Sequence, residues 1–128
     1  EAFNIDQIIT IPANIKILGR GYKNHITLFP NGKLILSNRC TLEGLSIKTS
    51  AAWVGSAVQI SGNRARIKDC TIDLTVATTN TSAVQAINVI GNGNRIVDCS
   101  IFGSLTTNKI GVLYTSGADN SDIDCEFT

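Results

Sequence analysis

Short runs of alternating apolar and polar residues follow one another along the whole chain. Val58 and Ile60 flank a polar residue, and Cys70, Ile72 and Leu74 alternate with Thr and Asp in the same way. Strict alternation is typical of β-strands with one buried face, and no segment keeps a 3.6-residue period for three helical turns. Residues that favour strands, such as Ile, Val and Thr, are abundant. The pattern therefore predicts an all-β chain of short strands.

These strands recur at a period of roughly 25 to 29 residues, which is typical of repeat proteins. Four copies of one hexapeptide read LEGLSI, IKDCTI, IVDCSI and DIDCEF, at residues 42–47, 67–72, 96–101 and 122–127. The strand before it repeats as well, because VQISGN at residues 58–63 matches INVIGN at residues 87–92. An earlier copy is visible where Ile9 and Ile17 align with Leu34 and Leu42. The repeat therefore fills the whole chain.

Repetition in one direction predicts that each repeat is one coil and that successive coils pair in parallel, about 4.8 Å apart. A meander of hairpins would also alternate, but its strands would not superimpose in the same direction. We therefore predict a right-handed parallel β-helix of about four to five coils, forming a single domain over residues 1–128. A stack this short has apolar ends that need covering, and the chain begins at Glu1 without Met. We expect a fragment of a longer protein, which self-associates or has an end covered by another domain.

Cysteines form one of the predicted columns inside the coils. In the proposed register Cys70, Cys99 and Cys125 stack on one another and continue a column that Leu45 begins. The chain has no C-x-x-C pair and one histidine, so we expect no zinc site and no other metal centre. A free buried cysteine behaves as a small apolar residue, so we expect core thiols rather than disulfides.

Two further columns fall at the corners between strands. One consists of the asparagines Asn38, Asn63 and Asn92, which predict a ladder of amides along the axis on backbone that tolerates left-handed conformation. The other consists of the aspartates Asp69, Asp98 and Asp124. Carboxylates one coil apart would lie about 5 Å from each other and those two coils apart about 10 Å. Glycosidases use pairs at about 5 to 9.5 Å, so acid–base catalysis is one interpretation. Capping of a turn is the commoner role of such an Asp.

The loops after the strands that end near Ile47, Ile72 and Ile101 vary in length and are rich in Ser, Thr and Asn. Insertions in solenoids cluster on one face, often the binding face. We predict glycan contacts from five loop residues: Trp53, Thr78, Thr79, Asn80 and Asn108. The indole could stack on a sugar ring, and the hydroxyls and amides suit sugar hydroxyls. The alternative is that Trp53 packs against its own loop or a neighbouring subunit.

Charge and the length of the apolar runs exclude several classes of partner. The net charge is +1, only 16% of residues are charged, and no Lys/Arg cluster exceeds a couple of residues. A nucleic-acid surface normally shows a basic stripe, so we expect no nucleic acid. The apolar runs are too short for membrane insertion. No cofactor is expected, and nothing indicates Ca²⁺, although stacked carboxylates could collect it.

The residues 9–21, ITIPANIKILGRG, resemble the early coil of pectin-lyase-like β-helices, and the Asp-Cys coils resemble inner rungs of that superfamily. Its members include polysaccharide lyases, glycoside hydrolases and bacteriophage tailspikes. Stacked free cysteines, low charge and polar loops look most like the tailspikes. That resemblance implies a homotrimer in the extracellular virion tail that recognises bacterial surface polysaccharide, with or without hydrolysing it. The alternatives are a purely structural stalk or trimerisation module, and a secreted lyase or epimerase of the same fold.

Overall fold

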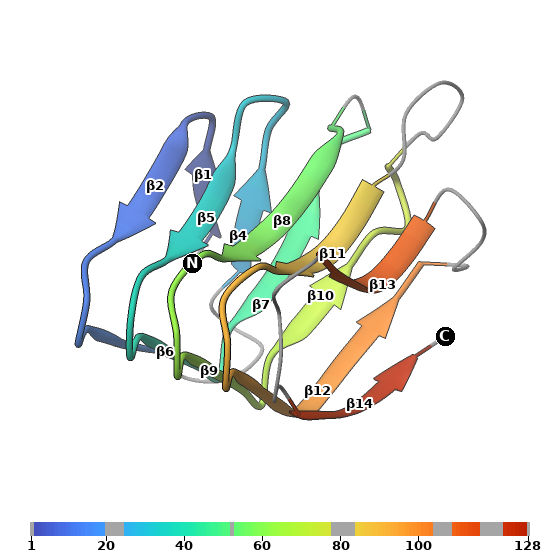
Figure 1. The fold of residues 1–128 in the computed structure, drawn as a ribbon. Helices are drawn as coiled ribbons and strands as arrows, with labels where there is room; N and C mark the ends of the chain where they lie inside the picture. The colour runs from blue at the N-terminus through green and yellow to red at the C-terminus, as the bar shows by residue number, and fades with distance from the viewer. Residues whose placement is uncertain are drawn as a thin grey trace.

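The computed structural model describes residues 2–19, 25–51, 53–77, 84–103, 109–115 and 122–127. These residues form an all-β solenoid of about four turns in which parallel strands stack (Figure 1). The predicted parallel β-helical architecture is therefore confirmed, at the lower end of the expected number of coils. Within the described ranges, no helix is long and apolar enough to span a membrane.

Each complete coil passes through three faces. The first face is a five-stranded parallel sheet formed by β2 (Ile8–Ile11), β5 (Lys33–Leu36), β8 (Gly55–Ile60), β11 (Val84–Val89) and β13 (Lys109–Tyr114). These strands lie side by side as one layer in Figure 1. Apolar and polar residues alternate along these strands, which gives each strand one buried side. The strand from Lys33 to Leu36, for example, buries every second residue.

The other two faces belong to one nine-stranded sheet. The second face consists of the short strands β3 (Lys16–Leu18), β6 (Thr41–Glu43) and β9 (Arg66–Lys68), with the first parts of β12 (Arg95–Phe102) and β14 (Asp122–Phe127). The third face consists of β1 (Ala2–Ile5), β4 (His25–Leu28), β7 (Ser46–Thr49) and β10 (Thr71–Asp73), with the last parts of β12 and β14. The two faces join because β12 and β14 continue through the corner that separates them.

The register between coils places like residues on like residues in the core. Ile72 pairs with Ile47 on one side and with Ile101 on the other, and all three are buried. Ile67 likewise pairs with Leu42 and Ile96 on the second face. These pairs are the ones that the sequence repeat predicts. Because each buried Ile or Leu contributes roughly 1.5 to 3 kcal/mol of burial energy, the columns supply most of the stabilisation.

The asparagine ladder at the corner between the first and second faces is confirmed. The Oδ1 atom of Asn38 accepts the backbone N–H of Asn63 at 2.8 Å, and Oδ1 of Asn63 accepts the backbone N–H of Asn92 at 2.8 Å. The left-handed backbone, however, lies at the residue that follows each ladder asparagine. The φ angles are 56° at Arg39, 58° at Arg64 and 66° at Gly93, and Asn14 holds the same position in the first coil with φ of 65°.

The last coil corrects one predicted alignment. The sequence repeat placed Asp124 in the column of Asp98, but Asp124 pairs with Val97, and the register then shifts so that Cys125 pairs with Cys99. Asp98 is therefore the extra residue of a β-bulge, which the following coil lacks. The Cys column survives this shift, whereas the Asp column ends at Asp98.

Two glycines at the Asn corner are fixed by close backbone contact between coils. A Cβ atom on Gly91 would lie 1.9 Å from the carbonyl oxygen of Gly62, and one on Gly62 would lie 2.2 Å from the carbonyl carbon of Ser37. Real Cβ atoms do not approach backbone this closely, so a side chain at either position would force the coils apart.

We expect Gly91→Ala to lower the free energy of unfolding by about 1 to 3 kcal/mol, because the methyl group overpacks the corner. Gly93→Asn is the matched control. A Cβ there would meet only the Arg64 side chain at 3.8 Å, and Asn tolerates the left-handed backbone. Urea unfolding of both variants checks this. Equal stability of Gly91→Ala and the parent chain would contradict the observed corner packing.

Candidate functional site

The three predicted catalytic aspartates occupy different environments. Asp69 and Asp98 hold the same corner position in adjacent coils, and both have left-handed backbone, with φ angles of 50° and 52°. The preceding coil has Gly44 at this position, with φ of 70°. Asp and Gly are residues that adopt this conformation readily, so the corner geometry itself accounts for both side chains. This favours the turn role for Asp69 and Asp98.

A shallow depression of about 290 Å³ on the second face holds two of these carboxylates. It is lined by Arg66, Lys68, Arg95, Val97, Asp98 and Asp124. The structure therefore brings Asp98 and Asp124 to one surface, while Asp69 is not among the lining residues. Three basic side chains share the depression with them, an arrangement that suits solvated charge pairs. A catalytic role for Asp69, Asp98 or Asp124 stays a prediction.

Trp53 lies in the core rather than on the binding face. Its side chain is 1% exposed, and its indole N–H donates a hydrogen bond of 2.8 Å to the carbonyl oxygen of Gly32. A ring buried this deeply has no face free for a sugar. Trp53 therefore supports the Gly32 turn from within the core and has no ring face exposed at the candidate site.

The remaining predicted glycan contacts, Thr78, Thr79, Asn80 and Asn108, lie outside the described residues. Their role stays a prediction. Of the predicted loops, only the one that contains Trp53 contributes described residues, Val54, Gly55 and Ser56, to a hollow at the edge where the chain turns from the third face to the first face.

This hollow, which we call the loop-edge hollow, has a volume of about 590 Å³. Three successive turns line it, namely the one before β2, the one before β5 and the one before β8. Its lining residues are Asp6, Gln7, Ile8, Pro30, Asn31, Gly32, Lys33, Val54, Gly55 and Ser56. A ligand that filled it would contact three coils at once and would lie along the solenoid axis.

The floor of the loop-edge hollow is built by the turn between β4 and β5. Gly32 donates its N–H to the carbonyl oxygen of Phe29 at 2.7 Å and accepts the Trp53 indole. A Cβ on Gly32 would lie 2.2 Å from the carbonyl oxygen of Ile5. This turn therefore needs glycine, and the buried indole holds it in place.

The polar wall of the hollow is partly pre-arranged by hydrogen bonds. Oδ1 of Asp6 accepts the backbone N–H of Asn31 at 3.1 Å, which links two coils. The Lys33 ammonium donates to Oε1 of Gln59 at 2.9 Å. Polar groups held in this way lose little further conformational freedom when a ligand binds.

Aliphatic side chains lie beside this polar wall. Ile8 is 62% exposed and Val54 is 48% exposed, and Pro30 completes the apolar strip. A concave surface that mixes a carboxylate, amides, an ammonium group and aliphatic carbon fits a ligand with many hydroxyls and apolar C–H faces. A sugar chain has that chemistry.

Cys70, Cys99 and Cys125 form a largely buried column, in which the hydrogen bond with Cys99 lowers the pKa of Cys70. All four are free thiols; Cys40, Cys70 and Cys99 are buried, and Cys125 is half-buried. The hydrogen bond with Cys70 raises the pKa of Cys99 well above its usual range, and burial raises it further. Burial also raises the pKa of Cys125 to about 12. Thiolates are the nucleophilic form, so Cys99 and Cys125 stay unreactive at neutral pH.

Comparison with known proteins gives no relative from which a function could be carried over. No protein-family model, no curated protein and no solved structure matches this chain. The strands and their register establish the parallel β-solenoid by themselves. The likeness to pectin-lyase-like proteins and tailspikes rests on the sequence pattern alone.

We expect Trp53→Phe to lower the free energy of unfolding by about 1 to 3 kcal/mol, because the buried carbonyl of Gly32 loses its donor. Val54→Ala, at the exposed neighbouring position, is the control and should change stability by less than about 0.5 kcal/mol. Chemical denaturation followed by circular dichroism measures both. An unchanged midpoint for Trp53→Phe would show that the indole does not support this turn.

Proposed function

We propose that this β-solenoid is a polysaccharide-recognition module that binds its ligand in the loop-edge hollow. One observation carries the proposal: three coils present a carboxylate, amides and an ammonium group beside exposed aliphatic side chains in one hollow. A linear polymer that lies along the axis contacts one coil after another. The parallel sheets keep these contacts at a fixed spacing of about 4.8 Å.

The source of the polysaccharide follows from the resemblance noted in the sequence. Stacked thiols, low overall charge and polar loops suggest a bacteriophage tailspike or tail fibre, and the proposed ligand is then a bacterial surface polysaccharide. In this proposal three copies associate side by side in the virion tail. Recognition does not require cleavage, and the hollow supports binding by its shape and polar groups alone.

Hydrolysis would need a separate pair of carboxylates. Asp98 and Asp124 share the depression on the second face, and they are the first pair to test for acid–base work. Asp6 is the carboxylate of the loop-edge hollow, and its Oδ1 already accepts a backbone hydrogen bond. Binding is therefore the function that we propose for the hollow.

A purely structural role is the second candidate, and the exposed apolar residues of the first coil favour it. Phe3, Ile8 and Leu18 are each more than half exposed. Phe3 and Leu18 also line an apolar depression of about 600 Å³ together with Ile5, Ile9 and Ile17. Contiguous exposed apolar surface of this kind marks association surfaces.

We expect Ile8→Ser/Val54→Ser to weaken polysaccharide binding about tenfold or more, because the aliphatic strip beside the polar wall is lost. Lys48→Gln, on the exposed third face, is the control and should bind as the parent chain does. Calorimetry against the best ligand from a panel of bacterial polysaccharides measures the affinities. Full affinity in the double variant would exclude the loop-edge hollow as the site.

Light scattering of the purified chain tests the proposed association. We expect the mass of a trimer, and Phe3→Ser/Leu18→Ser should lower that mass if the apolar first coil forms the contact. Thr10→Ser, on the exposed surface of β2, is the control. A defined oligomer that binds no polysaccharide would favour the structural role, and a monomer of the parent chain would contradict both association and the structural role.

A further inference from the structure

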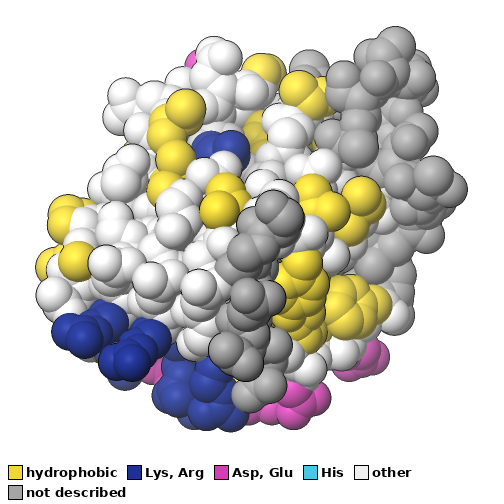
Figure 2. Space-filling model, viewed as in Figure 1, with side chains coloured by type: hydrophobic (Ala, Val, Ile, Leu, Met, Phe, Trp, Pro, Cys, Tyr) yellow, Lys and Arg dark blue, Asp and Glu magenta, His cyan; other side chains and the backbone are white. Residues whose placement is uncertain are grey.

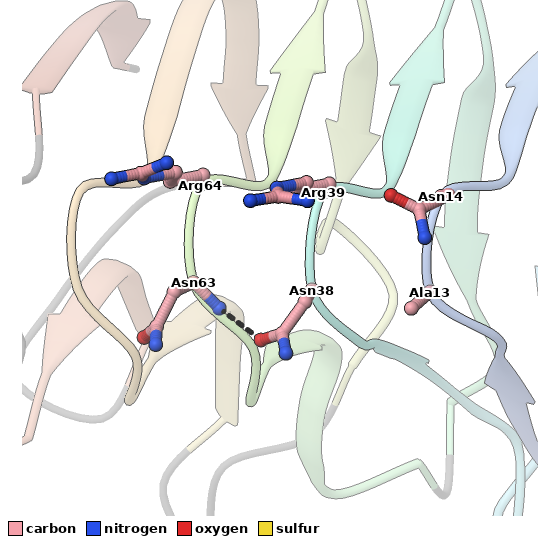
Figure 3. A pocket seen from close by; sticks show the side chains of 6 residues that line it. All are labelled: Ala13, Asn14, Asn38, Arg39, Asn63 and Arg64. Atoms are coloured by element: carbon pink, nitrogen blue, oxygen red, sulfur yellow. Dashed lines mark hydrogen bonds between the residues drawn. The ribbon is translucent and has the colours of Figure 1, made fainter.

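A second hollow lies at the other end of the first-face strands, at the corner that carries the asparagine ladder. It has a volume of about 420 Å³ and is lined by Ala13, Asn14, Asn38, Arg39, Asn63 and Arg64 (Figure 3). We call it the Asn–Arg groove. None of its lining residues belongs to the loop-edge hollow, so it does not depend on the function proposed above.

The acceptor groups of the ladder residues at this groove are already in use. The backbone carbonyls of Asn38 and Asn63 accept the N–H groups of Asn14 and Arg39, at 3.0 and 2.9 Å. The Oδ1 atoms of Asn38 and Asn63 accept the N–H groups of the next ladder residues. The Nδ2 groups of these two side chains can donate to a ligand in the groove.

The charge of the groove is positive. Arg39 and Arg64 hold the same position in adjacent coils, about 4.8 Å apart along the axis, and their side chains extend in the same direction (Figure 3). Among the described residues, neither guanidinium has an ion pair. The neighbouring carboxylate of Glu43 is engaged by Lys16 at 3.2 Å and by Lys68 at 3.9 Å.

Basic residues continue around the corner from this groove. Arg66, two residues after Arg64, pairs in register with Arg95 of the next coil on the second face. Figure 2 shows Lys and Arg side chains gathered along this edge of the molecule, with acidic side chains beyond them. Arg66 and Arg95 share their depression with Asp98 and Asp124, so the positive field at the groove comes chiefly from Arg39 and Arg64, although the net charge of the chain is only +1.

Backbone conformation makes the two arginines unusual at this corner. Both are in left-handed backbone, which a residue with a long side chain rarely adopts. The same position is filled by Asn14 in the first coil and by Gly93 in a later one, and both residue types suit this conformation. The corner itself therefore has no need of arginine, and such outliers point to a function.

We infer that the Asn–Arg groove binds an oxyanion, such as a carboxylate, sulfate or phosphate group, between the guanidiniums of Arg39 and Arg64. Each guanidinium can donate two parallel hydrogen bonds to an oxyanion, and the Asn Nδ2 groups add further donors. The anion also removes the repulsion between two like charges in adjacent coils. No aromatic side chain lines the groove, so the bases of a nucleic acid would have nothing to stack on.

Two sources could supply this group, namely a free anion or the acidic residues of a polysaccharide. Titration of the full chain with inorganic phosphate, sulfate, polygalacturonate and neutral dextran separates them, with binding followed by NMR shifts of the Asn63 and Arg64 amides. Arg39→Asn/Arg64→Asn is the test variant, because Asn at this corner reproduces the residue of the first coil. Lys48→Gln/Lys109→Gln removes the same two charges elsewhere and is the control.

We expect saturable binding of an anion that weakens as salt is added, with affinity reduced about tenfold or more in the arginine variant and unchanged in the control. Binding of polygalacturonate at far lower concentration than of phosphate identifies a polymer, and the reverse identifies a free anion. Absence of saturation with every anion would overturn the inference. So would equal loss in both variants, or equal binding of neutral dextran.

Discussion

Parallel hydrogen bonding between successive coils is the constraint on which the rest of this molecule depends. Because the coils pair in register, each position in one coil lies beside its equivalent in the next. Residues of the same type at equivalent positions therefore stack into a column. Isoleucine stacks on isoleucine in the core, as at Ile47, Ile72 and Ile101. At the corner, the carbonyl of Asn63 accepts the N–H of Arg39 and its side chain accepts the N–H of Asn92. Core, corner and surface groove are consequences of one pairing rule.

The core columns could be predicted from the sequence because the hexapeptide repeat records them directly. Ile67 and Ile96 align by inspection, and they pair in the structure. The last coil could not be placed in the same way. A bulge at Asp98 changes the residue count by one, and the DIDCEF segment alternates equally well in either register. Alternation identifies a strand and its buried face, but it does not identify which residue pairs with which.

The candidate site was harder to predict because it draws on the least regular part of the repeat. Asp6, Lys33 and Val54 come from three turns of different sequence, and only the stacking of coils brings them together. The sequence marks Trp53 and its loop as notable, but the indole is buried with a hydrogen bond to the carbonyl of Gly32, a backbone group that no side-chain pattern reveals. The positive corner was missed for a related reason, since Arg39 and Arg64 are isolated in the sequence and adjacent only across coils.

The glycine contact between Gly62 and Gly91 has a consequence for how such a chain can change in length. Gly91 packs against the backbone of Gly62, and Gly62 packs against the backbone of Ser37, so the two later coils of this corner carry glycine with no room for a side chain. A duplicated coil that keeps this glycine and the adjoining asparagine would insert without disturbing its neighbours. Each insertion would extend the outer grooves by one rung, about 4.8 Å. The number of coils thus sets the length of polymer that the surface can contact.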